Sequence, residues 1–385
     1  MKEIYLDHAA TTPIVPEVLD IVVDCLKNDF GNPSSMHGLG IRAEKRIKVA
    51  AKQVANLLGV LPEEILFTSG GTEANNLAIL GTAYDKKRRG MHCITTMIEH
   101  PSVLQAFSHL ESQGYEVTYL PVDADGVISL DDLKSSLRED TILVSIMHVN
   151  NEIGSIQGIQ EIGALLKREK ANLVFHVDAI QSFGKLPIRP EQWGIDLLSL
   201  SGHKIHAPKG IGALYIKKGL RLQPILFGGS QQGGIRSGTE NISGIVGLGQ
   251  AAKWIGERHT SEPDYLSQLK DKLAKGIQQA FPRAHINGSL DKAAPHILNV
   301  AFPGLRGEIL LHGLEEEGVY ISIGSACSSR NKKLSHVLTG IGLNDKMVEG
   351  SIRLSLSYLT TGEEIDEFIP ILIRTIERLE RYIRR

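Results

Sequence analysis

The sequence predicts an α/β protein with a mostly parallel central sheet in a large domain, followed by a smaller α+β domain. Two observations lead to this class. Short apolar runs alternate with helix-like patterns from about residue 14 to residue 256, as is typical of βα units that cover both faces of a sheet. The chain also has 385 residues. A single core stops growing at roughly 250 to 300 residues, so we expect two domains.

Strands of the large domain are expected where apolar runs are short and nearly continuous, because a sheet buried on both faces needs apolar residues at successive positions. Between two such runs, "GIQEIGALLKREK" at 158–170 shows helical periodicity and predicts a crossover helix. The predicted strands are 64–68, 93–96, 116–122, 141–147, 173–179, 196–201 and 212–216.

The domain boundary is expected in the polar stretch at 256–264, which joins two helical patterns. We therefore assign 14–256 to the large domain, and 1–13 together with 257–385 to the small domain. The small domain ends in a helical pattern whose apolar residues, from Ile365 onward, recur at spacings of three and four. This spacing predicts a packing face.

The composition argues against several classes of protein. Lys and Arg number 42 against 44 Asp and Glu, a net charge of -2, so bulk charge does not indicate a nucleic-acid partner. Three cysteines are too few for a disulfide framework, and the first residues do not resemble a signal peptide. With no run of 18 apolar residues, we expect a cytoplasmic protein that does not enter the membrane.

A phosphate site is indicated after the strand-like run at 64–68. There "SGGTEANNLAIL" forms a glycine turn that opens a helix, so Gly71 allows close approach of an anion and Thr72 adds a hydroxyl. The segment matches neither the P-loop nor the dinucleotide fingerprint. An ordinary tight turn with a threonine cap stays open as the alternative.

Two further strand ends carry charged residues. Asp178 ends the run at 173–179 and Gln181 follows it, while Lys204 comes one βα unit later in "SGHK". A buried carboxylate needs a partner, and a protonated pyridine nitrogen is one. A phosphate cradle, this aspartate and a lysine together favour pyridoxal phosphate held as a Schiff base on Lys204. The alternative for Lys204 alone is a surface or ion-paired lysine.

Other residues can be given a role beside this group. His100 precedes a proline that would open a helix, and its ring can stack on a cofactor or move protons; a helix cap is the simpler alternative. Asn151 and Arg353 can bind a substrate carboxylate, for which an arginine fork is suited. The glycine-rich stretch at 228–241 is either a linker or part of the phosphate site.

The cysteines differ in their surroundings. Cys25 and Cys93 lie in apolar patterns where cysteine acts as a small buried hydrophobe. Cys327 lies in "SIGSACSSRNKK", a segment of small residues with cations after it, which favours a loop at about 322–333 and a reactive thiolate. We predict no metal site, since His203 and His206 lack further ligands, and no serine hydrolase, since no nucleophile elbow follows a strand.

Eight motifs, spread in order over the whole chain, resemble the cysteine desulfurases of the iron-sulfur cluster assembly type. This family is class V aminotransferase-like, and the resemblance implies the type I fold of pyridoxal-phosphate-dependent transferases. The motifs are "YLDHAATTP" at 5–13, "FGNPSSMH" at 30–37, "TSGGTEANN" at 68–76, "MHVNNEIG" at 147–154, "HVDAIQSFGK" at 176–185, "SGHKIHAPKGIG" at 201–212, "RSGTEN" at 236–241 and "GSACSS" at 324–329.

The resemblance assigns roles position by position. Lys204 would be the Schiff-base lysine, Asp178 the partner of the pyridinium, Gln181 a donor to the phenolic oxygen and His100 the stacking residue. Phosphate would be held by Gly71, Thr72, Ser201 and His203, joined by Thr239 from the other subunit of a homodimer. Asn151, beside the cofactor, and Arg353 would bind the substrate carboxylate. Cys327 would accept the sulfur.

The implied reaction converts L-cysteine to L-alanine and leaves a persulfide on Cys327, for delivery to an iron-sulfur scaffold or to a tRNA or thiamin thiolation enzyme. Alternatives are a selenocysteine lyase, another class V aminotransferase, or a sulfur-relay adaptor with weak catalysis. One departure is Ala207, where the family often has glycine; this substitution puts the conformation of the lysine loop in question.

Overall fold

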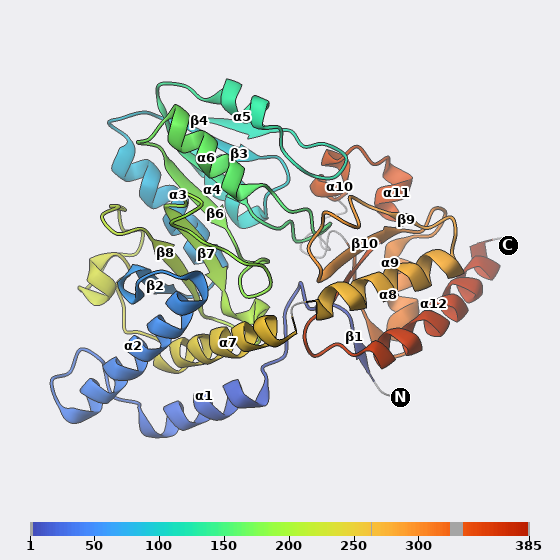
Figure 1. Ribbon diagram of the computed structural model, residues 1–385, viewed down its shortest axis with the longest axis horizontal. Helices are drawn as coiled ribbons and strands as arrows, with labels where there is room; N and C mark the ends of the chain where they lie inside the picture. The colour runs from blue at the N-terminus through green and yellow to red at the C-terminus, as the bar shows by residue number, and fades with distance from the viewer. Residues whose placement is uncertain (1–2, 263, 324–333, 384–385) are drawn as a thin grey trace.

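The computed structural model describes residues 3–262, 264–323 and 334–383. A seven-stranded sheet with the order β2-β8-β7-β6-β5-β3-β4 forms the centre of the larger lobe (Figure 1). All its neighbouring strands are parallel except at β8, which runs antiparallel to β2 and β7. The strands are β2 (Ile65–Thr68), β3 (His92–Thr96), β4 (Glu116–Leu120), β5 (Thr141–Met147), β6 (Val174–Asp178), β7 (Leu197–Ser201) and β8 (Gly212–Ile216).

The predicted α/β class with a mostly parallel sheet is confirmed, and all seven predicted runs are strands. Two of them, β5 and β8, have the predicted bounds. The run predicted for 116–122 ends earlier, at Leu120, because Pro121 has no N–H to donate to the ladder.

The sheet is buried on both faces, and successive residues alternate between two separate apolar cores. Leu66, Leu143 and Leu197 belong to the core beneath α3 (Gly71–Lys86) and α4 (Pro101–Ser112). Their neighbours Phe67, Val144 and Leu198 belong to the core beneath α2 (Gly38–Leu58), α6 (Ile159–Glu169) and α7 (Ile242–Ser261). This arrangement explains why the strand sequences are apolar without interruption.

The smaller lobe, orange to red in Figure 1, is built on a four-stranded antiparallel sheet with the order β12-β13-β10-β9. Its strands are β9 (His285–Ile286), β10 (Ile297–Ala301), β12 (Ser322–Ile323) and β13 (Ser351–Ser355). The first strand of the chain, β1 (Ile4–Tyr5), also belongs here, because it pairs with β11 (Val319–Tyr320). The remaining helices are α1 (Pro16–Asn28), α5 (Leu130–Ser136), α8 (Tyr265–Ala280), α9 (Gly307–Glu315), α10 (His336–Gly340), α11 (Asp345–Glu349) and α12 (Gly362–Ile383).

Most of the polar stretch at 256–264, where the domain boundary is expected, is helical. α7 continues to Ser261, and α8 begins at Tyr265. The polar composition reflects the exposed last turns of α7, where Arg258 and Glu262 form an ion pair of 3.0 Å one helical turn apart. Composition alone cannot separate such a helix end from a loop.

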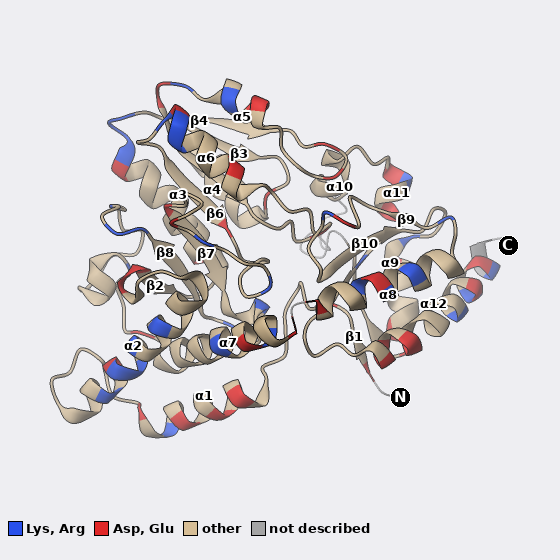
Figure 2. Cartoon of the chain, viewed as in Figure 1, with Lys and Arg blue, Asp and Glu red and all other residues tan. Residues whose placement is uncertain are grey.

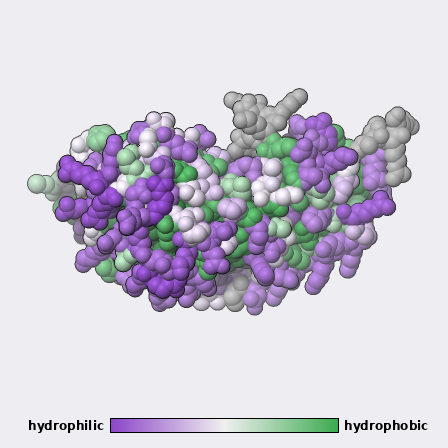
Figure 3. All heavy atoms as spheres, turned by 90° about the horizontal axis from the view of Figure 1, so that it is seen from above, coloured by the Kyte–Doolittle hydropathy of each residue, from purple (hydrophilic) through white to green (hydrophobic). Residues whose placement is uncertain are grey.

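The surface is that of a globular protein with mixed charge. Figure 2 shows Lys and Arg interspersed with Asp and Glu on the outer helices α1, α2 and α12. α12 turns its spaced apolar residues inward, so that Ile365, Phe368 and Leu372 are buried. In the view of Figure 3, hydrophilic residues cover the two ends and apolar residues show through toward the middle. No helix in the described ranges is long and apolar enough to span a membrane.

The packing of α7 on α2 leaves no room for a side chain at Gly249. A Cβ atom there would lie 2.6 Å from the Cα of Ala50. We predict that Gly249→Ala lowers the free energy of unfolding by about 1–3 kcal/mol, because the added methyl overpacks a backbone contact. The midpoint of urea unfolding measures this loss. The control is Gly362→Ala at the start of α12, where the nearest atom is 3.5 Å away at the tip of Lys272. Equal midpoints for the two variants would contradict the prediction.

Candidate active site

A cavity of about 280 Å³ lies where the carboxyl ends of the parallel strands approach the small sheet. Such strand ends are where α/β sheets place ligand sites. The strands β2, β3, β5, β6 and β7 each lead into it. Its lining is Ala9, Ala10, Gly71, Thr72, His100, Ser102, Met147, Val149, Asn151, Asp178, Ile180, Gln181, Ser201, His203, Lys204 and Arg353.

Asp178 is the last residue of β6 and is 4% exposed. Its Oδ1 accepts the N–H of Ile180 at 2.9 Å, and its Oδ2 accepts Nδ2 of Asn75 at 2.7 Å. Burial raises the pKa of the carboxyl, while these two hydrogen bonds and the charge of Lys204 act in the opposite sense. A carboxylate in this setting gains from a cation inside the cavity.

Lys204 follows β7 at the end of a short 3₁₀ turn, Gly202–Lys204. Its Nζ donates to the carbonyl oxygens of Ala9 and Ala10, both at 2.7 Å. The Nε2 of Gln181 donates to the same Ala9 carbonyl at 2.9 Å. The amine is therefore held over the cavity by the N-terminal segment.

The N-terminal segment is joined to the lysine loop along its length. The backbone and hydroxyl of Thr12 both donate to the carbonyl of His203, at 2.9 and 3.0 Å. The same hydroxyl accepts the N–H of His206 at 2.7 Å. Ala207 does not strain the loop, because the positive φ angles of this loop are at His206 (70°) and Gly210 (77°) and not at Ala207.

The helix α3 presents an uncapped N-terminus to the cavity. Gly70 at its N-cap has a φ of 155°, a conformation that glycine adopts readily, and no side chain caps the first amides. A Cβ on Gly71 would lie 2.2 Å from Cδ1 of Ile180, so only glycine leaves this space open. Beside it, the buried Oγ of Ser201 has no hydrogen-bond partner among the described residues.

His100 caps α4 and lines the cavity as a neutral ring. Its Nδ1 accepts the backbone N–H of Ser102 at 3.1 Å, which leaves the proton on Nε2 when the ring is neutral. Burial, with the charges of Lys204 and His336, lowers the pKa of His100 to about 4. Both alternatives considered from the sequence, a helix cap and a cavity residue, therefore describe it.

Arg353 reaches the cavity from β13 of the small sheet and is 5% exposed. Its Nη1 donates to the carbonyl of Asn151 at 2.8 Å, and its Nη2 pairs with Asp7 at 2.8 Å. Its Nε and the Oδ1 of Asn151 are buried without a partner in the described part of the chain. The Nε of Arg353 can donate a hydrogen bond to the carboxylate of a small ligand, and the Oδ1 of Asn151 can accept one from its amine.

One predicted residue, Thr239, is exposed and absent from the cavity lining of its own chain. Cys327, the predicted sulfur acceptor, lies outside the described residues. The glycine-rich stretch around Thr239 is held to the large domain, since Arg236 pairs with Glu73 at 2.8 Å and Gln232 bonds to the backbone of Phe67 in both directions. It is thus not a free linker.

The sequence interpretation missed Ala9, Ala10, Asn75 and Ser102. The first two act through backbone carbonyls, which no side-chain pattern reveals. Asn75 donates both to Asp178 and to Ser102 Oγ, and lies one turn after Thr72 in α3. The signal available in the sequence was an amide residue one turn into the helix that the glycine turn opens.

These residues fit pyridoxal phosphate. The uncapped helix end, the unpaired Ser201 hydroxyl and the Gly71 opening suit its phosphate. The buried Asp178 suits its ring nitrogen, and the Lys204 amine suits its aldehyde carbon. The unpaired Oε1 of Gln181 lies in the same lining.

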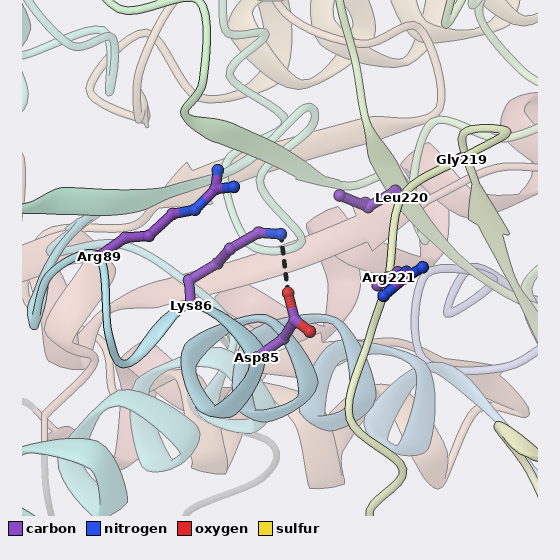
Figure 4. Close-up of a pocket in the computed structure, with 6 residues that line it drawn as sticks. All are labelled: Asp85, Lys86, Arg89, Gly219, Leu220 and Arg221. Atoms are coloured by element: carbon purple, nitrogen blue, oxygen red, sulfur yellow. Dashed lines mark hydrogen bonds and ion pairs between the residues drawn. The ribbon is translucent and has the colours of Figure 1, made fainter.

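A second cavity, of about 410 Å³, lies at the opposite end of α3 (Figure 4). Its lining is Asp85, Lys86, Arg89, Gly219, Leu220 and Arg221, and Lys86 pairs with Asp85 at 2.7 Å. With a rise of 1.5 Å per residue, α3 separates this cavity from Gly71 by roughly 20 Å. Its cations suit the negative end of the helix dipole and are not part of the first cavity.

Comparisons with known proteins agree with this geometry. The class-V aminotransferase family matches residues 4–368. A protein named cysteine desulfurase IscS from Dictyoglomus turgidum is 43% identical, covering 98% of this chain and 95% of its own, and its namesake from Pectobacterium atrosepticum is 46% identical, covering 98% and 93%. The structure of a NifS-like protein matches with a TM-score of 0.92 and 37% identity over 98% of this chain and 100% of its own. An apo cysteine desulfurase from Thermococcus onnurineus gives 0.86 and 26%, over 97% and 95%.

The stability of the protein should fall as the pH falls from about 6.5 to about 4. Burial lowers the pKa of six histidines to about 3 or 4: His8, His100, His148, His176, His203 and His206. Since the unfolded chain binds these protons near pH 6.5, protonation favours unfolding in that window. Glu99 and Glu152, whose pKa values burial raises to about 8 and about 7, act oppositely but are fewer.

His176→Gln isolates one of these histidines. His176 is fully buried between the hydroxyls of Ser145 and Ser199, at 2.8 and 2.9 Å. The free energy of unfolding, measured by urea titration between pH 6 and pH 5, should depend on pH less steeply in the variant by up to about 1.4 kcal/mol per pH unit. The same slope in both proteins would show that His176 does not contribute.

Proposed function

The chain belongs to the class-V aminotransferase family and, within it, to the cysteine desulfurases; on that premise we propose how its residues carry the reaction. The protein is a pyridoxal-phosphate-dependent enzyme that converts L-cysteine to L-alanine and transfers the sulfur for iron-sulfur cluster assembly. We infer that 14–256 form the cofactor domain, and that 1–13 with 257–385 form the second domain, which contributes Arg353 to the cavity.

One observation supports the sulfur-transfer role above the others. β12 ends at Ile323, and its Ser322 and Ile323 pair with Arg353 and Ile352 of β13. Cys327 follows Ile323 by four residues, which span at most about 14 Å. The chain therefore enters the cysteine segment beside the arginine that lines the cavity, and we propose that Cys327 is the sulfur acceptor.

The bound cofactor supplies an electron sink for the pair released when the α-proton of cysteine leaves. Lys204 would take and return that proton, and the Asp178 carboxylate would keep the ring nitrogen protonated. Arg353 and Asn151 would hold the substrate carboxylate, and the neutral ring of His100 would lie against the cofactor. Gly71, Thr72, Ser201 and His203 would hold the phosphate, and Gln181 would bond the phenolic oxygen.

The sulfur step involves only chain and substrate atoms. The thiolate of Cys327 forms an S–S bond to the substrate sulfur while the C–S bond breaks. The electron pair of that bond stays with the carbon, which is protonated to the methyl group of alanine. A persulfide on Cys327 results, ready for an acceptor thiol.

We propose a homodimer because the large lobe exposes three large apolar side chains: Phe30 is 69% exposed, Met36 96% and Phe227 86%. Such side chains are candidates for a contact with a second copy of the chain. That contact would let Thr239, which does not line its own cavity, reach the phosphate end of the other copy's cavity. We further propose a cytoplasmic enzyme that passes sulfur to a scaffold protein, without direct nucleic-acid binding.

Replacing Cys327 tests the sulfur step. Cys327→Ala should keep the cofactor absorbance and its change on addition of cysteine, but lose sulfur release by about three orders of magnitude, since no other nucleophile replaces the thiolate. Intact and peptide mass spectrometry after a short incubation should show one added sulfur on the Cys327 peptide of the unaltered enzyme. Cys25→Ala, in the core of α1, is the matched control.

Full sulfur release by Cys327→Ala would exclude the assignment. Steady transfer of the amino group to an oxo acid would favour an aminotransferase, and a strong preference for selenocysteine would favour a lyase of that substrate. Failure to take up pyridoxal phosphate would favour a relay adaptor.

Met36→Asp combined with Phe227→Asp should convert the dimer to a monomer, because two buried charges would replace apolar contacts. Multi-angle light scattering measures the mass. Leu359→Asp changes a 40% exposed leucine elsewhere and should leave the dimer intact. A monomeric unaltered protein that binds the cofactor would contradict the proposed dimer.

A further inference from the structure

The helix α10 follows the segment that contains Cys327 and is fixed to the rim of the cofactor cavity. Ser335 is its N-cap, and the Ser335 hydroxyl accepts the N–H of Leu338 at 3.1 Å. The same hydroxyl donates to Oε2 of Glu152 at 2.5 Å. This bond joins residues 183 positions apart, so it ties the small domain to the loop after β5.

A second contact holds the next residue. The Nε2 of His336 donates to the carbonyl oxygen of Glu99 at 2.9 Å, directly before the cavity residue His100. Beneath both contacts lies a small apolar core that is separate from the two main ones. It contains Ile98, Ile153, Val337, Leu338, Ile341 and Val348. The start of α10 is thus anchored on two loops of the large sheet at once.

Glu152 is held rigidly on the other side of this contact. The side chain of Asn150 accepts the N–H groups of Glu152 and Ile153, at 2.8 and 3.0 Å, and donates to the carbonyl of Ile98 at 3.0 Å. The preceding residue, Asn151, accepts Nη1 of Arg353 through its carbonyl at 2.8 Å. The turn that contains Asn151 and Glu152 therefore contacts both Arg353 and the start of α10.

The burial of Glu152 reduces the free energy of folding that the protein gains at this position. Glu152 is 6% exposed, and burying a carboxyl group costs free energy that a hydrogen bond only partly offsets. Burial raises the pKa of Glu152 to about 7, against the Ser335 hydrogen bond and the charge of Arg353. Replacing a buried ionisable group by a well-packed apolar residue is often neutral or stabilising, so stability alone does not explain a glutamate at this position.

We propose that Glu152 and Ser335 are positioning residues for sulfur transfer. Their hydrogen bond fixes Ser335, eight residues after Cys327 and directly before α10, against the turn that Arg353 contacts. The described residues on the two sides of the cysteine segment, in β12 and at Ser335, are thus both joined to elements beside the substrate site. The inference rests on the proposed function, since it assigns to this bond the alignment of Cys327 with the substrate sulfur.

The test compares Ser335→Ala, Glu152→Ala and the double variant in the cofactor-loaded full chain. The matched control is Ser129→Ala, which removes the N-cap of α5 on an exposed loop. Three quantities are measured: the absorbance change on cysteine binding, the single-turnover rate of persulfide formation on Cys327 by mass spectrometry, and hydrogen exchange in residues 336–343.

We expect each single variant to keep the absorbance change and to form the persulfide about tenfold more slowly than Ser129→Ala. Exchange in 336–343 should quicken. Because both residues act through one bond, the double variant should be no slower than the slower single. Glu152→Gln, which keeps an oxygen acceptor for Ser335, should recover most of the rate.

Persulfide formation at the control rate in Ser335→Ala would overturn the inference. So would loss of the absorbance change together with the rate, which would make the bond a general structural support, or strictly additive losses in the double variant. Absence of persulfide in the unaltered enzyme would instead refute the proposed function, and this inference with it. Hydrogen exchange in 336–343 distinguishes failure of this inference from failure of the proposed function, because it reports the anchoring of α10 without any turnover.

Discussion

The buried carboxylate of Asp178 is the constraint on which the site depends. A charge that ends a strand with apolar neighbours is tolerated only where donors and a cation surround it. Asn75 on α3 and the backbone of Ile180 provide the donors, and the cavity in front provides the place for the cation. Because Asn75 is on the helix that begins at Gly71, one hydrogen bond aligns the uncapped N-terminal end of α3 with the carboxylate.

The parallel topology of the sheet brings the other cavity residues close to Asp178. Each of β2, β3, β5, β6 and β7 releases its chain at the same edge, so residues far apart in sequence meet there without a dedicated motif. The N-terminal segment completes the arrangement from the other lobe. β1 pairs with β11, and a few residues later Ala9 and Ala10 accept the Lys204 amine. The segment thus connects the small sheet directly to the reactive amine.

The sequence patterns predicted those features that depend on residues near one another in the chain. Strands buried on both faces have to be apolar, so their positions were evident, and an end such as Leu120 was displaced only by the following proline. The polar residues from 256 onward indicated a domain boundary, and the structure shows that those up to Ser261 form the exposed end of α7, because polar residues suit a helix end as well as a loop. The long-range bonds from Lys204 to Ala9 and from Ser335 to Glu152 leave no periodicity, so no reading of neighbouring residues finds them. Motifs indicated Lys204 and Asp178, but not that backbone carbonyls would hold the amine.

The reversed direction of β8 has a consequence for the chemistry. Since β8 runs antiparallel to β7, the connection from Ser201 to Gly212 leaves the sheet and returns to it at one edge, with ladder bonds pinning both of its ends. A lysine on such a closed turn has little backbone freedom. In the proposed reaction, the movement of the Lys204 amine between cofactor and substrate carbon would therefore depend on rotation about the four methylene groups of its own side chain, while its backbone stays in place.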